Sequence, residues 1–193
     1  MQVPKRLRLD RVASPGPCGR FAFDHILVNP VKAKESYIRF TATNGVVLAQ
    51  VDLLLEDGDR LPPLGLYLLG ARVLPDLERG RRVRVLGKGG LELADTGAMY
   101  PWVPMGEGRV WPQNIGECIP PQEAVQEAET LWVDATEFHR LAMAFGKGGA
   151  RAAAPIRLLR ERGKGPYSMR FIESDIPQNS YRTAIMPLSQ GVG

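Results

Sequence analysis

Few side chains in this sequence could carry out catalysis. The 193-residue chain has two histidines, His25 and His139, and two cysteines, Cys18 and Cys118. Acid–base catalysis at His139 would require a nucleophile or a second titratable group beside it, and only Asp134 precedes it at a distance of about one helical turn. We therefore interpret His139 as a solvated histidine on a helix face and His25 as structural. A hydrolase built around His139 is the alternative.

The histidines and cysteines also lack the spacing of a metal site. A structural zinc ion takes four Cys or His ligands at close spacing. This chain contains no Cys-x-x-Cys motif, and its two cysteines lie in different parts of the sequence. We expect no metal, no cofactor and no enzymatic activity.

Glycine and lysine recur in three short runs that could approach a phosphate group: Gly87–Gly90, Gly146–Gly149 and Gly163–Gly165. A P-loop requires Gly-x-x-x-x-Gly-Lys-Ser/Thr. In each run glycine follows the lysine, so none is a nucleoside triphosphate site. We interpret the runs as turns; the alternative is that their lysines reach a nucleic-acid backbone.

Positive charge is concentrated toward the C-terminal end. The net charge is only +4, but eight basic residues and a single acid, Glu161, lie between Arg140 and Arg170. A basic surface attracts polyanions by neutralising phosphates and releasing counterions. We predict that this region binds the phosphates of a nucleic-acid backbone, with an ordinary solvated surface as the alternative. The residues predicted to bind nucleic acid are Arg140, Lys147, Arg151, Arg157, Arg160, Arg162 and Lys164.

The elements that position these residues are mostly strands. Alternation of apolar and basic residues predicts a half-buried strand over Arg6–Val12, which ends at the loop Ser14–Pro17 because two prolines and a glycine interrupt it. Asn44-Gly45 predicts a tight hairpin between two β-rich runs. The further predicted strands of this part are Arg20–Val28, Ser36–Thr43 and Val46–Leu55.

A second set of elements follows in the order strand, helix, strands. A short helix near Pro75 separates the predicted strand Leu64–Leu69 from a hairpin of Arg81–Leu86 and Leu91–Ala94. The prolines and tryptophans after Asp95 predict an ordered connection. The acidic stretch from Glu117 to Glu129 resembles a linker.

The last part repeats this order. Leu131–Val133 predicts a short strand, and Asp134 with Glu137 has the pattern of a capping box at the start of a helix. Apolar residues from Phe138 to Phe145 recur at helical spacing, and the helix is expected to end at Gly146. Three more strands are predicted: Pro155–Arg160, Tyr167–Ile172 and Tyr181–Leu188.

The element order indicates an α+β fold of antiparallel sheets, built from repeated strand-helix-strand-strand-strand units with two short helices. We expect an N-terminal β-rich unit (1–56), a first unit with its Pro- and Trp-rich connection (64–120), an acidic linker (121–130) and a second unit (131–193). No apolar run approaches the roughly 18 to 20 residues that cross a bilayer, and no signal-peptide pattern is present. We therefore expect a cytoplasmic protein without a membrane partner.

Four segments resemble bacterial DNA sliding clamps, the ring-shaped processivity factors of replicative polymerases. Ile38–Gly45 is similar to the family's Leu-x-Leu-x-Ala-Thr-Asp-Gly hairpin, and Val110-Trp111-Pro112 through Ile119-Pro120 is similar to its aromatic-Pro segment. Leu131–Asp134 with the following helix resembles the start of a clamp domain. Ala184–Leu188 resembles the family's C-terminal Val-Met-Pro-Met-Arg-Leu. The family's Asp-Gly-His-Arg is Asn44-Gly45-Val46-Val47 here, so the chain would be a reduced or divergent relative.

The resemblance implies a non-enzymatic, ring-forming homo-oligomer whose inner helices face duplex phosphates without reading bases. It adds Arg72 and Arg79 on the first helix to Arg140 and Lys147 at the second. The family's cleft for partner peptides, which would bind a polymerase or a clamp-loading protein, maps here to Met186, Pro187 and Leu188. The alternative function is an adaptor or inhibitor of replication or transcription machinery that does not bind DNA and uses Tyr100–Pro121 as its contact surface.

Overall fold

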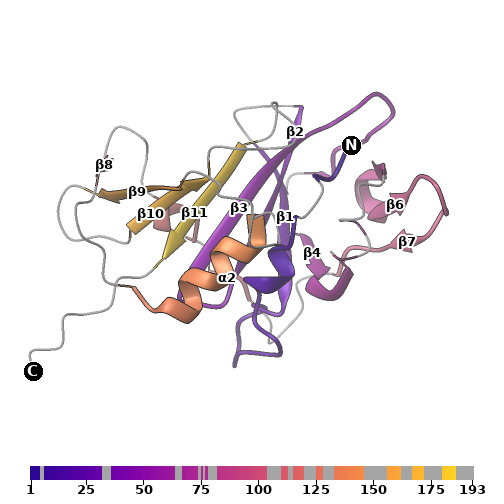
Figure 1. Cartoon of the computed structure of the whole chain (residues 1–193). Coiled ribbons are helices and arrows are strands. Elements are labelled where there is room, and N and C mark those ends of the chain that lie inside the picture. The colour runs from indigo at the N-terminus through magenta and orange to yellow at the C-terminus, as the bar shows by residue number, and fades with distance from the viewer. Residues whose placement is uncertain are drawn as a thin grey trace, which may run out of the picture.

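The computed structural model describes residues 1–4, 7–31, 36–63, 67–73, 75, 77, 82–103, 110–112, 115–119, 125–127, 133–145, 156–161, 167–171 and 180–185. The largest structural element among these residues is one antiparallel sheet of eight strands, with helix α2 (Ala135–Phe145) lying across it (Figure 1). The strands of this sheet are β1 (His25–Pro30), β2 (Tyr37–Thr43), β3 (Val47–Leu54), β4 (Tyr67–Gly70), β8 (Val125–Glu127), β9 (Ile156–Glu161), β10 (Tyr167–Phe171) and β11 (Ser180–Ile185).

The large sheet joins the two ends of the chain. Its strand order is β4-β1-β2-β3-β11-β10-β9-β8, and every neighbouring pair is antiparallel. The junction is the pairing of β11 with β3, in which Ile185 lies opposite Val47 and Ser180 lies opposite Asp52. Residues on either side of the expected boundaries at 56 and 131 therefore contribute to one sheet.

A second, small sheet holds β5 (Val83–Val85), β6 (Leu91–Leu93) and β7 (Met99–Tyr100). It follows β4 and the 3₁₀-helix η2 (Ala71–Val73), so the predicted order strand, helix, strand, strand, strand is confirmed. The turn between β5 and β6 contains the 3₁₀-helix η3 (Gly87–Gly89). Trp102 packs against this turn and donates from Nε1 to the Gly87 carbonyl oxygen at 2.6 Å, which agrees with the expected ordered connection.

In the second unit, α2 and strands β9, β10 and β11 follow the predicted order, and a strand that was not predicted precedes them. The strand before α2 in the described part of the chain is β8, which pairs with β9 and lies within the acidic segment expected as a linker. Backbone pairing to a neighbouring strand stabilises β8, and composition alone does not register such long-range pairing. Leu131 and Trp132 lie outside the described residues.

The hairpin predicted at Asn44-Gly45 is confirmed between β2 and β3. Gly45 has a φ of 94°, a conformation that side chains disfavour. The Asn44 side-chain oxygen Oδ1 accepts hydrogen bonds from the backbone N–H groups of Val46 and Val47, each at 3.0 Å. This local bonding explains why the turn could be recognised from two residues.

The strand predicted over Arg6–Val12 is wrong. Residues Leu9–Arg11 form the 3₁₀-helix η1, closed by a hydrogen bond from the Val12 N–H to the Leu9 carbonyl oxygen at 3.0 Å. Leu9 and Val12 are both fully buried, and their spacing of three residues places them on one face of a 3₁₀ turn. The alternation of Leu7 and Leu9 suggested a strand, but burial of residues three apart favours the helical turn.

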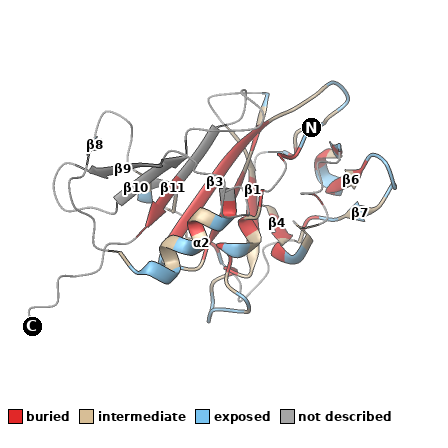
Figure 2. Cartoon of the chain, viewed as in Figure 1, coloured by how far each residue is buried: buried red, intermediate tan, exposed pale blue. Residues whose placement is uncertain are grey.

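The core lies between the large sheet and a layer of helices. Ile38 and Phe40 of β2 and Val51 and Leu53 of β3 point to the same side of the sheet, where they join Leu141 and other buried residues of the core. Figure 2 shows the buried residues of α2 on its sheet side and exposed residues on its outer side. The α+β, antiparallel fold class is confirmed. No helix in the described part of the chain is long and apolar enough to span a membrane.

Candidate nucleic-acid face and apolar pocket

Three helical elements lie side by side on one face of the large sheet: α2, η1 and η2 (Figure 1). Their apolar residues, including Leu9, Ala71 and Leu141, belong to the same core. The backbone N–H of Arg8 donates to the Ala144 carbonyl oxygen at 2.9 Å and ties η1 to the C-terminal half of α2. We call the outer surface of these three elements the helix face.

Helix α2 begins at the predicted N-cap, Asp134, whereas the Glu137 side chain of the predicted capping box accepts a hydrogen bond from Asn44 Nδ2 at 2.8 Å. The Asp134 carboxylate oxygen Oδ1 accepts hydrogen bonds from the backbone N–H groups of Thr136 at 2.8 Å and Glu137 at 3.1 Å. These bonds satisfy two of the donors that a helix leaves unpaired at its start. The cap fixes the register of the helix and therefore the positions of Glu137, His139 and Arg140.

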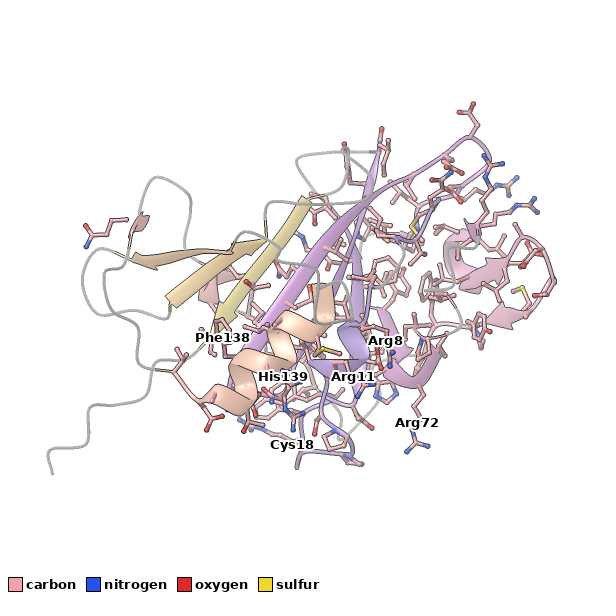
Figure 3. All side chains as sticks on the ribbon, viewed as in Figure 1. Arg8, Arg11, Cys18, Arg72, Phe138 and His139 are labelled. Carbon is pink, nitrogen blue, oxygen red and sulfur yellow. The ribbon has the colours of Figure 1, made fainter. Side chains whose placement is uncertain are left out.

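The helix face carries exposed arginines. Arg11 of η1 and Arg72 of η2 are exposed, and neither forms an ion pair with another described residue. Arg8 instead makes two hydrogen bonds to the Asp10 carboxylate, at 2.8 and 2.7 Å. In Figure 3 the Arg72 side chain points away from the sheet. Within the described ranges, no carboxylate pairs with Arg11 or Arg72, and both side chains are exposed where an anion could approach them.

Arg140 of α2 also lies on the helix face and is less exposed than Arg11 and Arg72. Its Nε lies 3.4 Å from Oε1 of Glu137, and 37% of its side chain is exposed. The Nε atom itself is buried without a hydrogen-bond partner. The 3.4 Å distance allows electrostatic attraction between the guanidinium and the carboxylate, but the Nε–H makes no hydrogen bond to it. Because Nε is buried, the exposed area of the side chain belongs to its other atoms.

The structure places only part of the predicted nucleic-acid site. It brings Arg72 and Arg140 onto one face and adds Arg11, which the sequence analysis had assigned to a strand. Arg157 and Arg160 lie on β9, where only the backbone is described. The remaining predicted residues lie outside the described part of the chain: Arg79, Lys147, Arg151, Arg162, Lys164, Met186, Pro187 and Leu188.

The second feature is an apolar pocket at the end of the large sheet. It has a volume of about 160 Å³ and lies where the β2–β3 hairpin meets the end of β11 and the 3₁₀-helix η4 (Ile115–Cys118). The Thr43 hydroxyl donates to the Val47 carbonyl oxygen at 2.6 Å, so little polar capacity is left on this wall. The lining residues are Phe23, Thr43, Gly45, Val46, Val47, Leu48, Pro112, Ile115, Cys118, Ala184 and Ile185.

Aromatic residues support one side of the pocket. Phe23 is stacked on Phe21 with ring centroids 5.1 Å apart and meets Trp111 edge-on at 5.8 Å. The Arg20 guanidinium lies over the Phe21 ring at 5.1 Å. Val46 and Val110 expose 42% and 43% of their surfaces beside this cluster. The pocket and its surroundings therefore favour an apolar ligand.

Sequence reasoning did not identify this pocket. The hairpin was singled out only as a motif, and partner binding was assigned to Met186, Pro187 and Leu188. The alternative contact surface, Tyr100–Pro121, contains three residues that line the pocket, Pro112, Ile115 and Cys118. The apolar residue Val46, directly after the Asn44-Gly45 turn, was the feature of the sequence that could have indicated an apolar site there.

The two histidines differ in their surroundings. His139 is exposed on α2, and His25 Nδ1 lies 2.8 Å from the Asp24 carboxylate. Among the described residues, no three His, Cys, Asp or Glu side chains lie together as metal ligands would.

The sheet shared by both ends of the chain, with its helices gathered on one face, defines a clamp-like fold. Solved structures of bacterial DNA sliding clamps, the β subunits of DNA polymerase III, are similar to it over nearly the whole chain. The resemblance seen in the four short motifs is thus confirmed at the level of the fold. No protein-family model and no curated protein matches the sequence.

Three clamps illustrate the similarity. The Thermotoga maritima β subunit has a TM-score of 0.60 and 11% identity, with 98% of this chain and 65% of that chain covered. The Bartonella birtlesii clamp, bound to griselimycin, has a TM-score of 0.60 and 13% identity, with coverages of 95% and 63%. The H. pylori clamp, in complex with diflunisal, has a TM-score of 0.58 and 12% identity, with coverages of 98% and 66%. This chain therefore spans slightly less than two thirds of the length of these clamps.

Proposed function

We propose that this chain is a non-enzymatic, clamp-like protein that acts in DNA replication or repair in the cytoplasm and contacts duplex DNA through its helix face. The observation that carries the proposal is the placement of η1, η2 and α2 on one face, with Arg11 and Arg72 exposed there without ion-pair partners among the described residues. The clamp-like fold supports it.

The chemistry of the helix face favours phosphates over bases. Isolated guanidinium groups on a broad surface bind phosphate oxygens, which are present at every nucleotide step. Base-edge recognition requires an element that enters a groove, whereas here short helices lie flat on a sheet. Contact should therefore be independent of sequence and weaken steeply as salt rises.

The apolar pocket provides the second part of the proposal. We propose that it receives an apolar segment of a partner protein, such as a polymerase or a clamp-loading protein. Clamps of similar fold hold griselimycin in Bartonella birtlesii and diflunisal in H. pylori. Encircling a duplex would further require self-association of this chain, and the mass of the protein in solution at micromolar concentration tests that step.

Fluorescence anisotropy tests the DNA part of the proposal. Two labelled duplexes of unrelated sequence should bind with equal affinity at low salt, and both affinities should fall linearly on logarithmic axes as salt is raised. Absence of binding at low ionic strength would overturn the proposal. Preference for one duplex would replace it with sequence-specific recognition.

A second candidate function is an adaptor that binds a protein without contacting DNA. It is favoured by the pocket, whose lining includes none of the arginines of the helix face. An affinity experiment with the full chain separates the two functions. A partner recovered equally before and after nuclease treatment, together with no duplex binding, would support the adaptor.

A further inference from the structure

The turn that forms one wall of the pocket is held from two sides by a single side chain. Asn44 Oδ1 accepts hydrogen bonds from the backbone N–H groups of Val46 and Val47, both of which line the pocket. Asn44 Nδ2 donates to Oε2 of Glu137 at 2.8 Å, across 93 residues of sequence. The orientation of one amide group therefore fixes both the tip of the hairpin and its attachment to α2.

Glu137 connects this turn to the helix face. Its other carboxylate oxygen, Oε1, lies 3.4 Å from Nε of Arg140, and only 17% of its side chain is exposed. One carboxylate thus bridges Asn44, which shapes the pocket, and Arg140, which belongs to the helix face. The Arg140 Nε has no hydrogen bond to hold it to this carboxylate, so an external anion can compete for the guanidinium.

We propose that Glu137 is a positioning residue that couples the helix face to the apolar pocket. A phosphate bound at Arg140 draws the guanidinium away from Glu137, and the carboxylate then accepts the Asn44 N–H without a competing cation. A stronger bond to Asn44 holds the Val46 and Val47 backbone more firmly and orders this pocket wall. This inference rests on the proposed function, because the phosphate is that of the bound duplex.

Coupling of this kind is reciprocal. If duplex binding orders the pocket wall, a ligand that requires the ordered wall must strengthen duplex binding by the same factor. A partly exposed ion pair controls the coupling, so we expect a change of about two- to fivefold in either affinity.

Methyl NMR of the full chain with labelled valines tests the coupling. On titration with a short duplex, the Val46 and Val47 methyl signals should shift in proportion to DNA saturation. In Glu137→Gln, the side-chain amide oxygen still accepts from Asn44 but the charge that attracts Arg140 is gone, so the duplex-dependent shift should disappear. Glu92→Gln, which removes the similar ion pair with Arg84 at 3.3 Å, should respond as the unmodified chain does.

A second variant tests the same link without DNA. Arg140→Gln removes the competing cation and should move the Val46 and Val47 signals toward their duplex-bound positions. Duplex binding without a shift at these methyls, or an unchanged response in Glu137→Gln, would overturn the coupling and leave the proposed function standing. Failure of the duplex to bind at low ionic strength would overturn both the coupling and the proposed DNA-binding function.

Discussion

The helix face and the apolar pocket are built by different means. Exposed side chains such as Arg11 and Arg72 provide the charge of the helix face, and each sits on a short local turn. The pocket instead joins Phe23, the β2–β3 hairpin, η4 and the end of β11. A charged face can be altered one side chain at a time at little cost in stability, whereas the pocket exists only when long-range pairing of β3 with β11 is intact.

Both regions nevertheless contact the larger of two buried clusters, which includes Leu141 of α2 and the pocket residues Val47 and Ile185, whereas Phe23 and Trp111 belong to a smaller second cluster. Removing a central side chain of the larger cluster should therefore destabilise both regions together. Phe40 is 1% exposed, between the sheet and the helix layer. Phe40→Ala should lower the free energy of unfolding by about 3–5 kcal/mol, the usual cost of a large cavity. Urea denaturation measures this decrease. Val46→Ala, at the exposed hairpin tip, is the control and should change stability by less than about 0.5 kcal/mol. Loss of one region without the other would show that they fold independently.

The next largest effect should come from the ion pair between β2 and β3. Asp52 has a side chain 2% exposed and accepts hydrogen bonds from Arg39 at 2.6 and 2.9 Å. Asp52→Ala leaves a partly buried guanidinium unpaired and should cost about 3 kcal/mol in the free energy of unfolding. Arg84→Ala, whose partner is more exposed, should cost under about 1 kcal/mol. Equal effects in the two variants would contradict the assigned role of burial.

The hydrogen bond to Asp52 raises the pKa of Arg39 above its ordinary value. Because the pKa is raised in the folded state, the charged guanidinium contributes fully to the free energy of unfolding below the ordinary arginine pKa. This contribution is lost only as the pH rises through the raised pKa of the folded state. The difference in unfolding free energy between Asp52→Ala and the unmodified chain should therefore stay constant from about pH 7 to pH 9. A difference that shrinks over this interval would place the titrating group elsewhere.

A glycine pair isolates the pocket from general backbone strain. Gly45 and Gly58 have φ values of 94° and 90°, but a Cβ at Gly45 would lie 3.4 Å from the Phe23 ring, whereas a Cβ at Gly58 would meet nothing within 4 Å. Each change to alanine should cost about 1–2 kcal/mol from the positive φ alone. Only Gly45→Ala should also shift the Phe23 ring signals in NMR spectra. Identical spectral changes at Phe23 in both variants would refute the assigned pocket wall.

The sequence predicted those parts of the molecule that local hydrogen bonding determines. Asn44-Gly45 and Asp134 satisfy nearby backbone groups themselves, so the hairpin and the start of α2 could be recognised without a fold. The 3₁₀-helix η1 was missed because Leu7 and Leu9 fit a strand pattern as well as a turn. Its conformation is decided by packing against α2, including the hydrogen bond from Arg8 to Ala144.

The pocket lay beyond sequence reasoning because its walls meet only through distant pairing. Thr43 and Ala184 become neighbours through the register of β3 with β11, which places Leu48 opposite Ala184. No local pattern encodes that register. Strand β8 was hidden in the same way, since its acidic composition resembles that of a linker while its backbone pairs with β9.

The salt dependence of duplex binding tests the central claim most directly. Arg11→Ala/Arg72→Ala removes two exposed cations from the helix face, and Arg84→Ala/Lys88→Ala removes two from the small sheet. If the helix face contacts DNA, the first variant should reduce the slope of log affinity against log salt by about 1.8, or about 0.9 for each phosphate that the protein no longer neutralises. The second variant should keep the slope of the unmodified chain. Equal slopes in all three proteins would contradict the assignment of the helix face as the DNA-contacting surface.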